Sequence, residues 1–151
     1  METTKNVSLE KPAMSHTFEQ WLEAMNGNSD KLDKLPLPVA YGVNSQMEYL
    51  KLANGTIAMW GHIEHGKNYP CTIPWDAAAG YASKEFTVTY PVALVDDSPT
   101  VFAIATADVN PDTWVLKRSQ GYTSFTGCYL CAVNETQNVK QCDLLVLGKW
   151  K

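Results

Sequence analysis

Residues 49–60 read Tyr-Leu-Lys-Leu-Ala-Asn-Gly-Thr-Ile-Ala-Met-Trp, and this stretch decides the fold class. Two short runs of strand-forming residues flank the dipeptide Asn54-Gly55. Asn-Gly supplies the positive φ angles that a tight type I′ turn requires, and it is a strong short-range signal for two paired strands. The stretch therefore predicts a β-hairpin with strands at 49–53 and 56–60.

Further strand candidates follow toward the C-terminus, and they are rich in Val, Thr, Ile and aromatic residues, which suit a half-buried pleated surface. They cover residues 85–92, 100–107, 113–119, 122–133 and 142–150. Turn-forming residues separate them, at 96–99, 110–112, 120–121 and 134–138. Short strands without helical patterns between them are typical of an antiparallel sandwich or a small barrel. We predict a mainly β protein, an antiparallel β-sandwich over residues 39–151 with a short N-terminal helical segment.

The longest stretch without a strand pattern runs from residue 65 to residue 84 and contains Pro70, Pro74 and the run Ala77-Ala78-Ala79-Gly80. Irregular segments of this length in a compact domain are often functional. We expect a long loop here.

The N-terminal part has a helical period instead. Thr17 and Gln20 can form a capping box, which places a helix start at this point. An apolar stripe follows at helical spacing, made of Phe18, Trp21, Leu22 and Met25. The residues Asn26-Gly27-Asn28 interrupt the stripe, and Gly is unfavourable inside a helix, so the pattern favours two short helices.

Leu32 and Leu35 extend the stripe to a short heptad run, which ends at the proline-rich break Leu35-Pro36-Leu37-Pro38. Two alternatives remain for this stripe: it packs on the chain's own core, or on copies of itself in an oligomer. We assign residues 1–38 as an N-terminal attachment or trimerisation segment with a linker, and residues 39–151 as the sandwich.

The composition excludes several classes of protein. The chain has 151 residues, 45% of them hydrophobic, which argues for one folded domain and against disorder. Its net charge is −4 and its basic residues are scattered, with only Lys117-Arg118 adjacent, so we expect no nucleic-acid partner. No stretch approaches the ~20 apolar residues of a membrane-spanning helix, so we expect no membrane insertion. The N-terminus lacks the apolar segment of a secretion signal.

The cysteines and histidines give little support to catalysis or metal binding. Cys128 and Cys131 lie on one predicted strand, where an offset of three sends their side chains to opposite faces. We expect them, with Cys71 and Cys142, to be free thiols. His62 and Glu64 share one face of the predicted strand, and His65 lies on the other face. A single chain therefore offers two ligands on one face, where a structural metal site needs four.

We therefore expect no metal, no other cofactor and no catalytic residue. Two alternatives are weighed against this. His62 from each of three chains could meet on a three-fold axis and hold a metal ion. A small metal or cysteine hydrolase would use His62, His65 and Cys71.

Aromatic residues near turns are the better candidates for function. Trp75-Asp76 and the segment Asp112-Thr113-Trp114 place a flat ring beside a carboxylate. Such a ring can stack on the face of a sugar while its polar neighbour bonds the hydroxyls. The alternative is that these rings close the ends of the sandwich core, because large aromatic residues are mostly buried. We predict a ligand-binding set of five residues, Trp75, Asp76, Tyr81, Asn110 and Trp114.

Four short motifs also occur in a characteristic order. They are LANGTIAMWG at 52–61, FTVTYPVAL at 86–94, TGCYL at 126–130 and LVLGKW at 145–150. This order resembles the C-terminal tip domains of bacteriophage tail fibres, which have a relative in the H-type lectins. The resemblance covers residues 49–151; Cys128 stands where that family usually carries Phe, and the 65–84 segment is an insertion. The N-terminal part is similar to the helical start of phage structural proteins.

The resemblance implies a β-sandwich with Trp60 and Trp150 in its core, and a homotrimer. It also implies a virion protein of the phage tail, made in the host cytoplasm, that binds a bacterial surface glycan or receptor without catalysis. Other tail proteins would contact the N-terminal segment. The alternative is a structural tail or baseplate component that binds other virion proteins.

Overall fold

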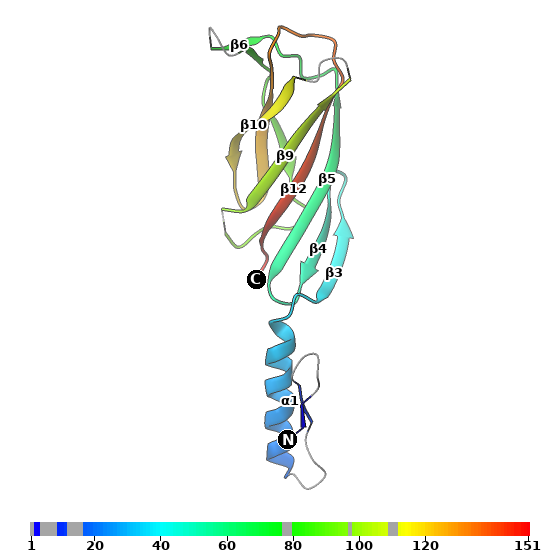
Figure 1. Cartoon of the computed structure of the whole chain (residues 1–151), viewed down its shortest axis with the longest axis vertical. Helices are drawn as coiled ribbons and strands as arrows, with labels where there is room; N and C mark the ends of the chain where they lie inside the picture. Colours follow the sequence, from blue (N-terminus) through cyan, green and yellow to red (C-terminus); the bar gives the residue numbers. More distant parts are fainter. Residues whose placement is uncertain (1, 4–8, 12–16, 77–79, 97, 109–111) are drawn as a thin grey trace.

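A computed structural model describes residues 2–3, 9–11, 17–76, 80–96, 98–108 and 112–151 of the chain. Antiparallel strands dominate, and they form two sheets that enclose one core, so the predicted mainly β sandwich is confirmed. A helix extends from one end of the sandwich, and strand β6 lies at the opposite end (Figure 1).

The larger sheet has the strand order β3-β4-β5-β12-β9. Its strands are β3 (Pro38–Val43), β4 (Glu48–Leu52), β5 (Thr56–Gly66), β9 (Thr100–Ala107) and β12 (Lys140–Lys149). Strand β12, next to the edge strand β9, pairs with β5 along its whole length and with β9 on its other side. Strand β12 therefore has hydrogen-bonded neighbours on both of its edges.

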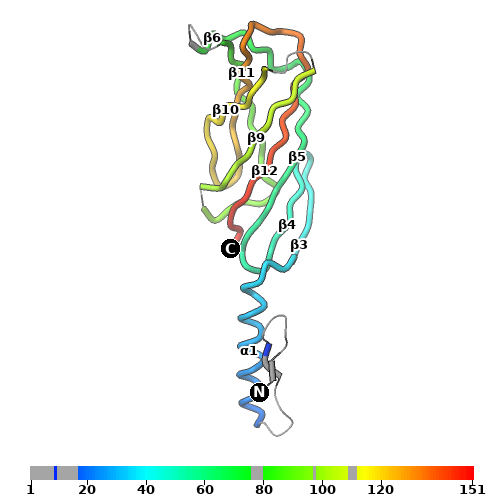
Figure 2. Tube along the Cα trace, in the orientation of Figure 1, coloured from blue at the N-terminus to red at the C-terminus, as the bar shows by residue number. Residues whose placement is uncertain are grey.

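The smaller sheet has the order β10-β11-β7-β6, with β8 also paired to β11. Its strands are β6 (Ile73–Asp76), β7 (Gly80–Ala82), β8 (Phe86–Thr89), β10 (Thr113–Gln120) and β11 (Ser124–Cys131). Figure 2 traces how the chain passes from the larger sheet to the smaller one after β5, returns for β9, and ends in β12.

The core lies between the sheets and is built by strict alternation. Ile57, Met59 and Ile63 of β5 point inward from the larger sheet, and Phe125 and Tyr129 of β11 meet them from the smaller one. A strand places successive side chains on opposite faces, so each inward residue leaves its neighbours on an outer face. The identity of those outward residues determines what each outer face can bind.

The predicted hairpin at 49–60 is confirmed as β4 and β5, with a loop one residue longer than a two-residue turn. Gly55 has φ +84°, and its N–H donates to the carbonyl of Leu52. Ala53 leaves the ladder because its N–H donates to the carbonyl of Leu37. The positive φ at Gly55 is the feature that the Asn-Gly signal anticipated.

The N-terminal helix is a single element, α1 (Phe18–Asp33), so the expectation of two short helices is wrong. The Thr17–Gln20 capping box is present and starts the helix as predicted. The interrupting Gly27 has open space around its α-carbon and simply continues the helical path. Two short strands, β1 (Glu2–Thr3) and β2 (Glu10–Lys11), pair with each other, and β2 contacts the helix.

Three further expectations need correction. The 65–84 segment is not a continuous loop, because it contains the paired strands β6 and β7. The edge strand β3 was not anticipated. Trp60 is not a core residue: it lies half-buried on the outer face of the larger sheet, whereas Trp150 does pack against the core and donates its indole N–H to Leu52.

Candidate functional site

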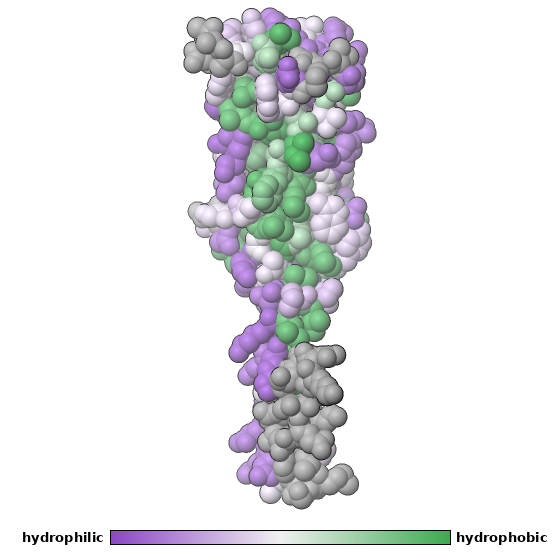
Figure 3. Space-filling view, in the orientation of Figure 1, coloured by the Kyte–Doolittle hydropathy of each residue, from purple (hydrophilic) through white to green (hydrophobic). Residues whose placement is uncertain are grey.

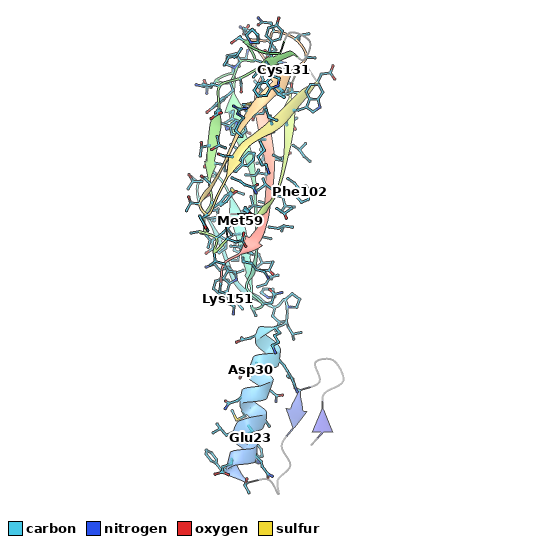
Figure 4. All side chains as sticks on the ribbon, turned by 90° about the vertical axis from the view of Figure 1, so that its left-hand side faces the viewer. Glu23, Asp30, Met59, Phe102, Cys131 and Lys151 are labelled. Atoms are coloured by element: carbon cyan, nitrogen blue, oxygen red, sulfur yellow. The ribbon has the colours of Figure 1, made fainter. Side chains whose placement is uncertain are left out.

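The outer face of the larger sheet is unusually apolar. Strand β9 alternates so that Phe102 and Ile104 point away from the core, and they are 55% and 65% exposed. Leu145 and Leu147 of β12 lie on the same face. Figure 3 shows a continuous hydrophobic stripe along this side of the molecule, and in Figure 4 Phe102 projects from the sandwich. Large contiguous apolar patches mark interaction surfaces.

An open hollow of about 600 Å³ lies on this stripe, bounded by Trp60, Phe102, Ile104 and Leu145. Register explains the grouping, because Leu145 is paired directly with Phe102 on one side and with Trp60 on the other. The lining contains few polar groups, so the hollow is suited to an apolar occupant.

The polar pair at one end of the hollow is His62 with Asp143. These residues are directly opposed on β5 and β12, and His62 Nδ1 lies 2.6 Å from Asp143 Oδ1. Glu64 Oε1 is 3.9 Å from the other ring nitrogen. As predicted, His62 and Glu64 share the outer face and His65 does not. The described residues contain no cluster of three or more side chains suited to hold a metal ion within one chain.

The outer face of the smaller sheet has a different character. Trp114 of β10 is paired with Leu130 of β11, Leu130 with Ala82 of β7, and Ala82 with Ile73 of β6. This row spans three strand spacings, roughly 14 Å. Trp114 at one end is 54% exposed, and Trp75 follows Ile73 at the other end with 41% exposed. Two tryptophans thus flank one sheet face at the end of the sandwich farthest from α1.

A pocket of about 210 Å³ lies beside Trp75 on this face, with Cys128 and Ala82 among its lining residues. The guanidinium of Arg118 lies 5.1 Å from the centre of the Trp75 ring, and its Nε donates to Glu85 at 3.0 Å. Arg118 projects here because the β10–β11 ladder shifts register between Lys117 and Ser119. Lys84 also lines the pocket.

The structure therefore brings together two of the five predicted ligand-binding residues, Trp75 and Trp114. Tyr81 lies on the opposite face of its strand, half-buried against the core, and so is turned away from them. Asn110 and the side chain of Asp76 lie outside the described part of the structure. The polar residues Arg118, Glu85 and Lys84 were missed, because Arg118 lies 33 positions from the adjacent pair Lys84-Glu85. The adjacent Lys117-Arg118 pair was the only signal in the sequence.

The end of the sandwich near this pocket is held by a buried ion pair. Lys140 is fully buried and donates to the carboxylate of Glu135, which also accepts from the backbone N–H groups of Gln137 and Asn138. Burial opposes the charge of Glu135, but these hydrogen bonds outweigh it and lower its pKa. The Glu135 N–H donates to the carbonyl of Cys71, which fixes the β11–β12 loop to the segment between β5 and β6.

The residues of the hydrolase alternative do not form a nucleophilic site. His62 lies on the outer face of the larger sheet, while Cys71 is fully buried between the sheets. His65 is half-buried, and its Nδ1 lies 2.7 Å from the hydroxyl of Tyr129. Burial, aided by a hydrogen bond with Cys131, raises the pKa of Cys71, so its thiol stays protonated and is a poor nucleophile.

The four cysteines are free and buried, and Cys128 and Cys131 face opposite sides of β11, as predicted. Cys128 lies under the pocket on the outer face, whereas Cys131 belongs to the core near the end of β11 (Figure 4). Burial raises the pKa of Cys142 to about 12. Among the described residues, no helix has the length and apolar character to span a membrane.

Comparison with known proteins gives matches at the level of structure. No protein-family model matches the chain, and no curated protein matches it. An N-truncated R1-type pyocin tail fibre matches with a TM-score of 0.56 and 15% identity, covering 90% of this chain and 99% of that one. A C-terminal R1 pyocin fibre fragment from P. aeruginosa matches with a TM-score of 0.51 and 14% identity.

That match covers 96% of this chain and 40% of the fibre. An R2 pyocin fibre fragment from P. aeruginosa gives a TM-score of 0.52 and 14% identity, with 97% of this chain and 38% of the fibre covered. The chain thus spans nearly all of the first structure and about two fifths of the other two. The chain therefore has a fold similar to that of these pyocin tail fibres.

Proposed function

We propose that this protein is the receptor-binding tip of a phage tail fibre or of a related injection apparatus. Residues 1–38 would attach it to other tail proteins, and residues 39–151 would bind a glycan or receptor on the bacterial surface without catalysis. The protein would be made in the host cytoplasm and would act as part of the virion. The observation that carries the proposal is the pair of exposed tryptophans on one face of a tail-fibre fold, at the end farthest from the helix.

The proposed assembly is a homotrimer formed through the outer face of the larger sheet. The apolar stripe there, with Phe102 and Ile104 at its most exposed points, is unfavourable in water for a single chain. The helix adds its own exposed apolar residues, among them Phe18 and Met25. A helix with such a stripe gains stability when copies bury it together. In the trimer, the other two copies cover both the outer face of the larger sheet and the apolar stripe of the helix.

The outer face of the smaller sheet is then free to meet the receptor. Trp75 and Trp114 are rigid, amphipathic surfaces that suit stacking on sugar rings. In a trimer the face is present three times, and linked weak sites gain strongly by avidity. Tyr81 would support this face from the core side, and Asp76 and Asn110 remain proposed contacts. The relation to H-type lectins also remains a prediction.

The experiment is a glycan array probed with the full chain and with three variants. Trp75→Ala and Trp114→Ala remove the two exposed rings, and Tyr122→Ala is the matched control, because Tyr122 is 51% exposed on the turn at the other end of β10. We expect each tryptophan variant to weaken binding about tenfold, the effect of losing an anchor residue worth roughly 1.4 kcal/mol. The Tyr122 variant should bind as the unchanged chain does.

If the chain binds glycans and neither tryptophan substitution weakens that binding, the outer face of the smaller sheet is not the binding face. A chain that binds no glycan at any density but binds a tail subunit tightly through this face would favour the alternative, a structural tail or baseplate component.

A further inference from the structure

The pocket beside Trp75 differs in charge from the rest of the molecule. The chain as a whole has a net charge of −4. The pocket, however, is lined by two cationic side chains, Arg118 and Lys84, and one carboxylate, Glu85. Its local charge is therefore positive on an otherwise acidic protein. Such a contrast attracts anions by complementarity.

Arg118 is the cation with the geometry to bind an anion. Its Nε donates to Glu85 at 3.0 Å, which orients the planar group, and its centre lies over the Trp75 ring. A guanidinium carries further N–H donors beyond Nε, arranged to match a carboxylate or a phosphate. Lys84 is partly engaged elsewhere, since its Nζ lies 4.9 Å from the centre of the Tyr69 ring. Arg118 is therefore the primary candidate.

The field of Arg118 also reaches the interior of the pocket. Cys128 is buried there, and its burial raises the pKa of the thiol. The charge of Arg118 acts in the opposite sense on that pKa, favouring a negative charge at this position, while Glu85 disfavours it. An anion entering the pocket would be attracted by the charge of Arg118 and repelled by that of Glu85. Of these two residues, Arg118 is the one that can donate hydrogen bonds to the anion.

The pocket also offers apolar surface for the remainder of a ligand. Ile73 and Trp75 are both exposed beside it, 52% and 41% respectively. One face of the Trp75 ring carries Arg118, so a sugar that enters the pocket along Ile73 and the edge of the Trp75 ring would bring its substituents close to the guanidinium. An aromatic ring next to a cation favours an acidic saccharide over a neutral saccharide.

We propose that the pocket lined by Trp75, Arg118 and Glu85 binds the anionic group, a carboxylate or a phosphate, of an acidic saccharide. The inference rests on the proposed function and deepens it. It assigns a negative charge to the receptor saccharide and names Arg118 as the residue that binds the charged group. Glu85 is a positioning residue, which orients the guanidinium and repels anions that lack a matching geometry.

The test compares matched acidic and neutral saccharides on one array. Oligogalacturonate is paired with its methyl ester, and phosphorylated oligosaccharides are paired with their dephosphorylated forms, so the two arms separate carboxylate from phosphate. The proteins are the unchanged chain, Arg118→Gln and Lys117→Gln. Lys117 is the matched control because it is the adjacent cation, bonds Gln120 and does not line the pocket. Circular dichroism confirms that each variant is folded.

We expect acidic members of the pairs to bind at least tenfold more tightly than neutral ones, and raised salt to reduce the difference. Arg118→Gln should abolish that preference, whereas Lys117→Gln should keep it, because a charge-assisted hydrogen bond supplies a difference of this size. Arg118→Lys should retain part of it, since the charge remains without the planar group.

Neutral saccharides that bind as well as acidic ones, with binding lost in Trp75→Ala, would overturn the inference and leave the proposed function in place. Absence of binding to every saccharide on the array would overturn both. An acid preference that Arg118→Gln and Lys117→Gln reduce equally would overturn the pocket and indicate only a diffuse surface attraction.

Discussion

The imidazole of His65 lies in an aromatic cluster at the end of the core, with ring centres 4.5 Å from Phe86 and 4.7 Å from Tyr69. Burial lowers the pKa of His65 below its ordinary value of 6.5, because the charged form loses hydration. Below about pH 6.5 the unfolded chain takes up a proton that the folded chain resists. The free energy of unfolding should therefore fall as the pH decreases through this range, until the folded-state pKa is passed.

Urea unfolding at about pH 7.5 and about pH 5.5 measures this loss, on either side of the ordinary histidine pKa. His65→Gln keeps a polar side chain but cannot titrate, so its loss of stability between the two values should be smaller than that of the unchanged chain. An equal loss in both proteins would show that other groups control the acid response.

Lys140 illustrates what the sequence could not reveal at the scale of single residues. Lysine is almost never fully buried, and nothing around it in the sequence marks it as a partner of Glu135. The pairing arises only because the β11–β12 loop folds back on itself. Trp75 and Trp114 were singled out because each ring lies beside turn-forming or acidic residues, but their exposure could not be predicted, because large aromatic residues are mostly buried. Arg118 and Glu85 could not be predicted either, because 33 positions separate them.

At the scale of elements, two glycines give opposite expectations for the same substitution. Gly27 is inside α1, and an added methyl group there would meet nothing within 4 Å. Gly27→Ala should therefore raise the free energy of unfolding by about 1 kcal/mol per chain, because alanine loses less backbone entropy in a helix.

Gly61→Ala should lower the free energy of unfolding, because its methyl group would clash with the backbone oxygen of Gln46. Thermal unfolding followed by circular dichroism measures both; a destabilised Gly27→Ala would mean that the helix packs differently at this position.

The strands that were predicted well are those with one buried face. Strand β9 coincides with the predicted 100–107, and its exposure alternates at every residue. Strand β3 was missed because it is an edge strand whose side chains are nearly all exposed, so it carries no alternation to detect. Strand β6 was missed because Pro74 argues against a strand, although an edge strand tolerates proline.

At the scale of the whole molecule, the proposed function assigns a different task to each sheet. The larger sheet turns an apolar face outward, which needs a partner; the smaller sheet turns outward two aromatic rings and an arginine pocket, which a solvated surface can present. Binary patterning predicts that a sandwich forms, but it does not indicate which outer face is apolar, because that depends on which strands become neighbours. Trp60 lies on that outer face because Ile57 and Met59 of the same strand point into the core.

The oligomeric state of the chain decides whether the apolar outer face of the larger sheet is an interface between copies. Size-exclusion chromatography with light scattering should give three times the 16.8 kDa mass of one chain. Phe102→Glu places an unpaired charge on that face, at a cost of several kcal/mol once it is desolvated, and should yield monomers. Trp114→Glu is the matched control, because Trp114 is 54% exposed against 55% for Phe102 but lies on the other sheet, so its trimer should persist. A monomeric unchanged chain, or dissociation caused by Trp114→Glu alone, would contradict an interface on the larger sheet and would leave the hydrophobic stripe in Figure 3 to a different partner.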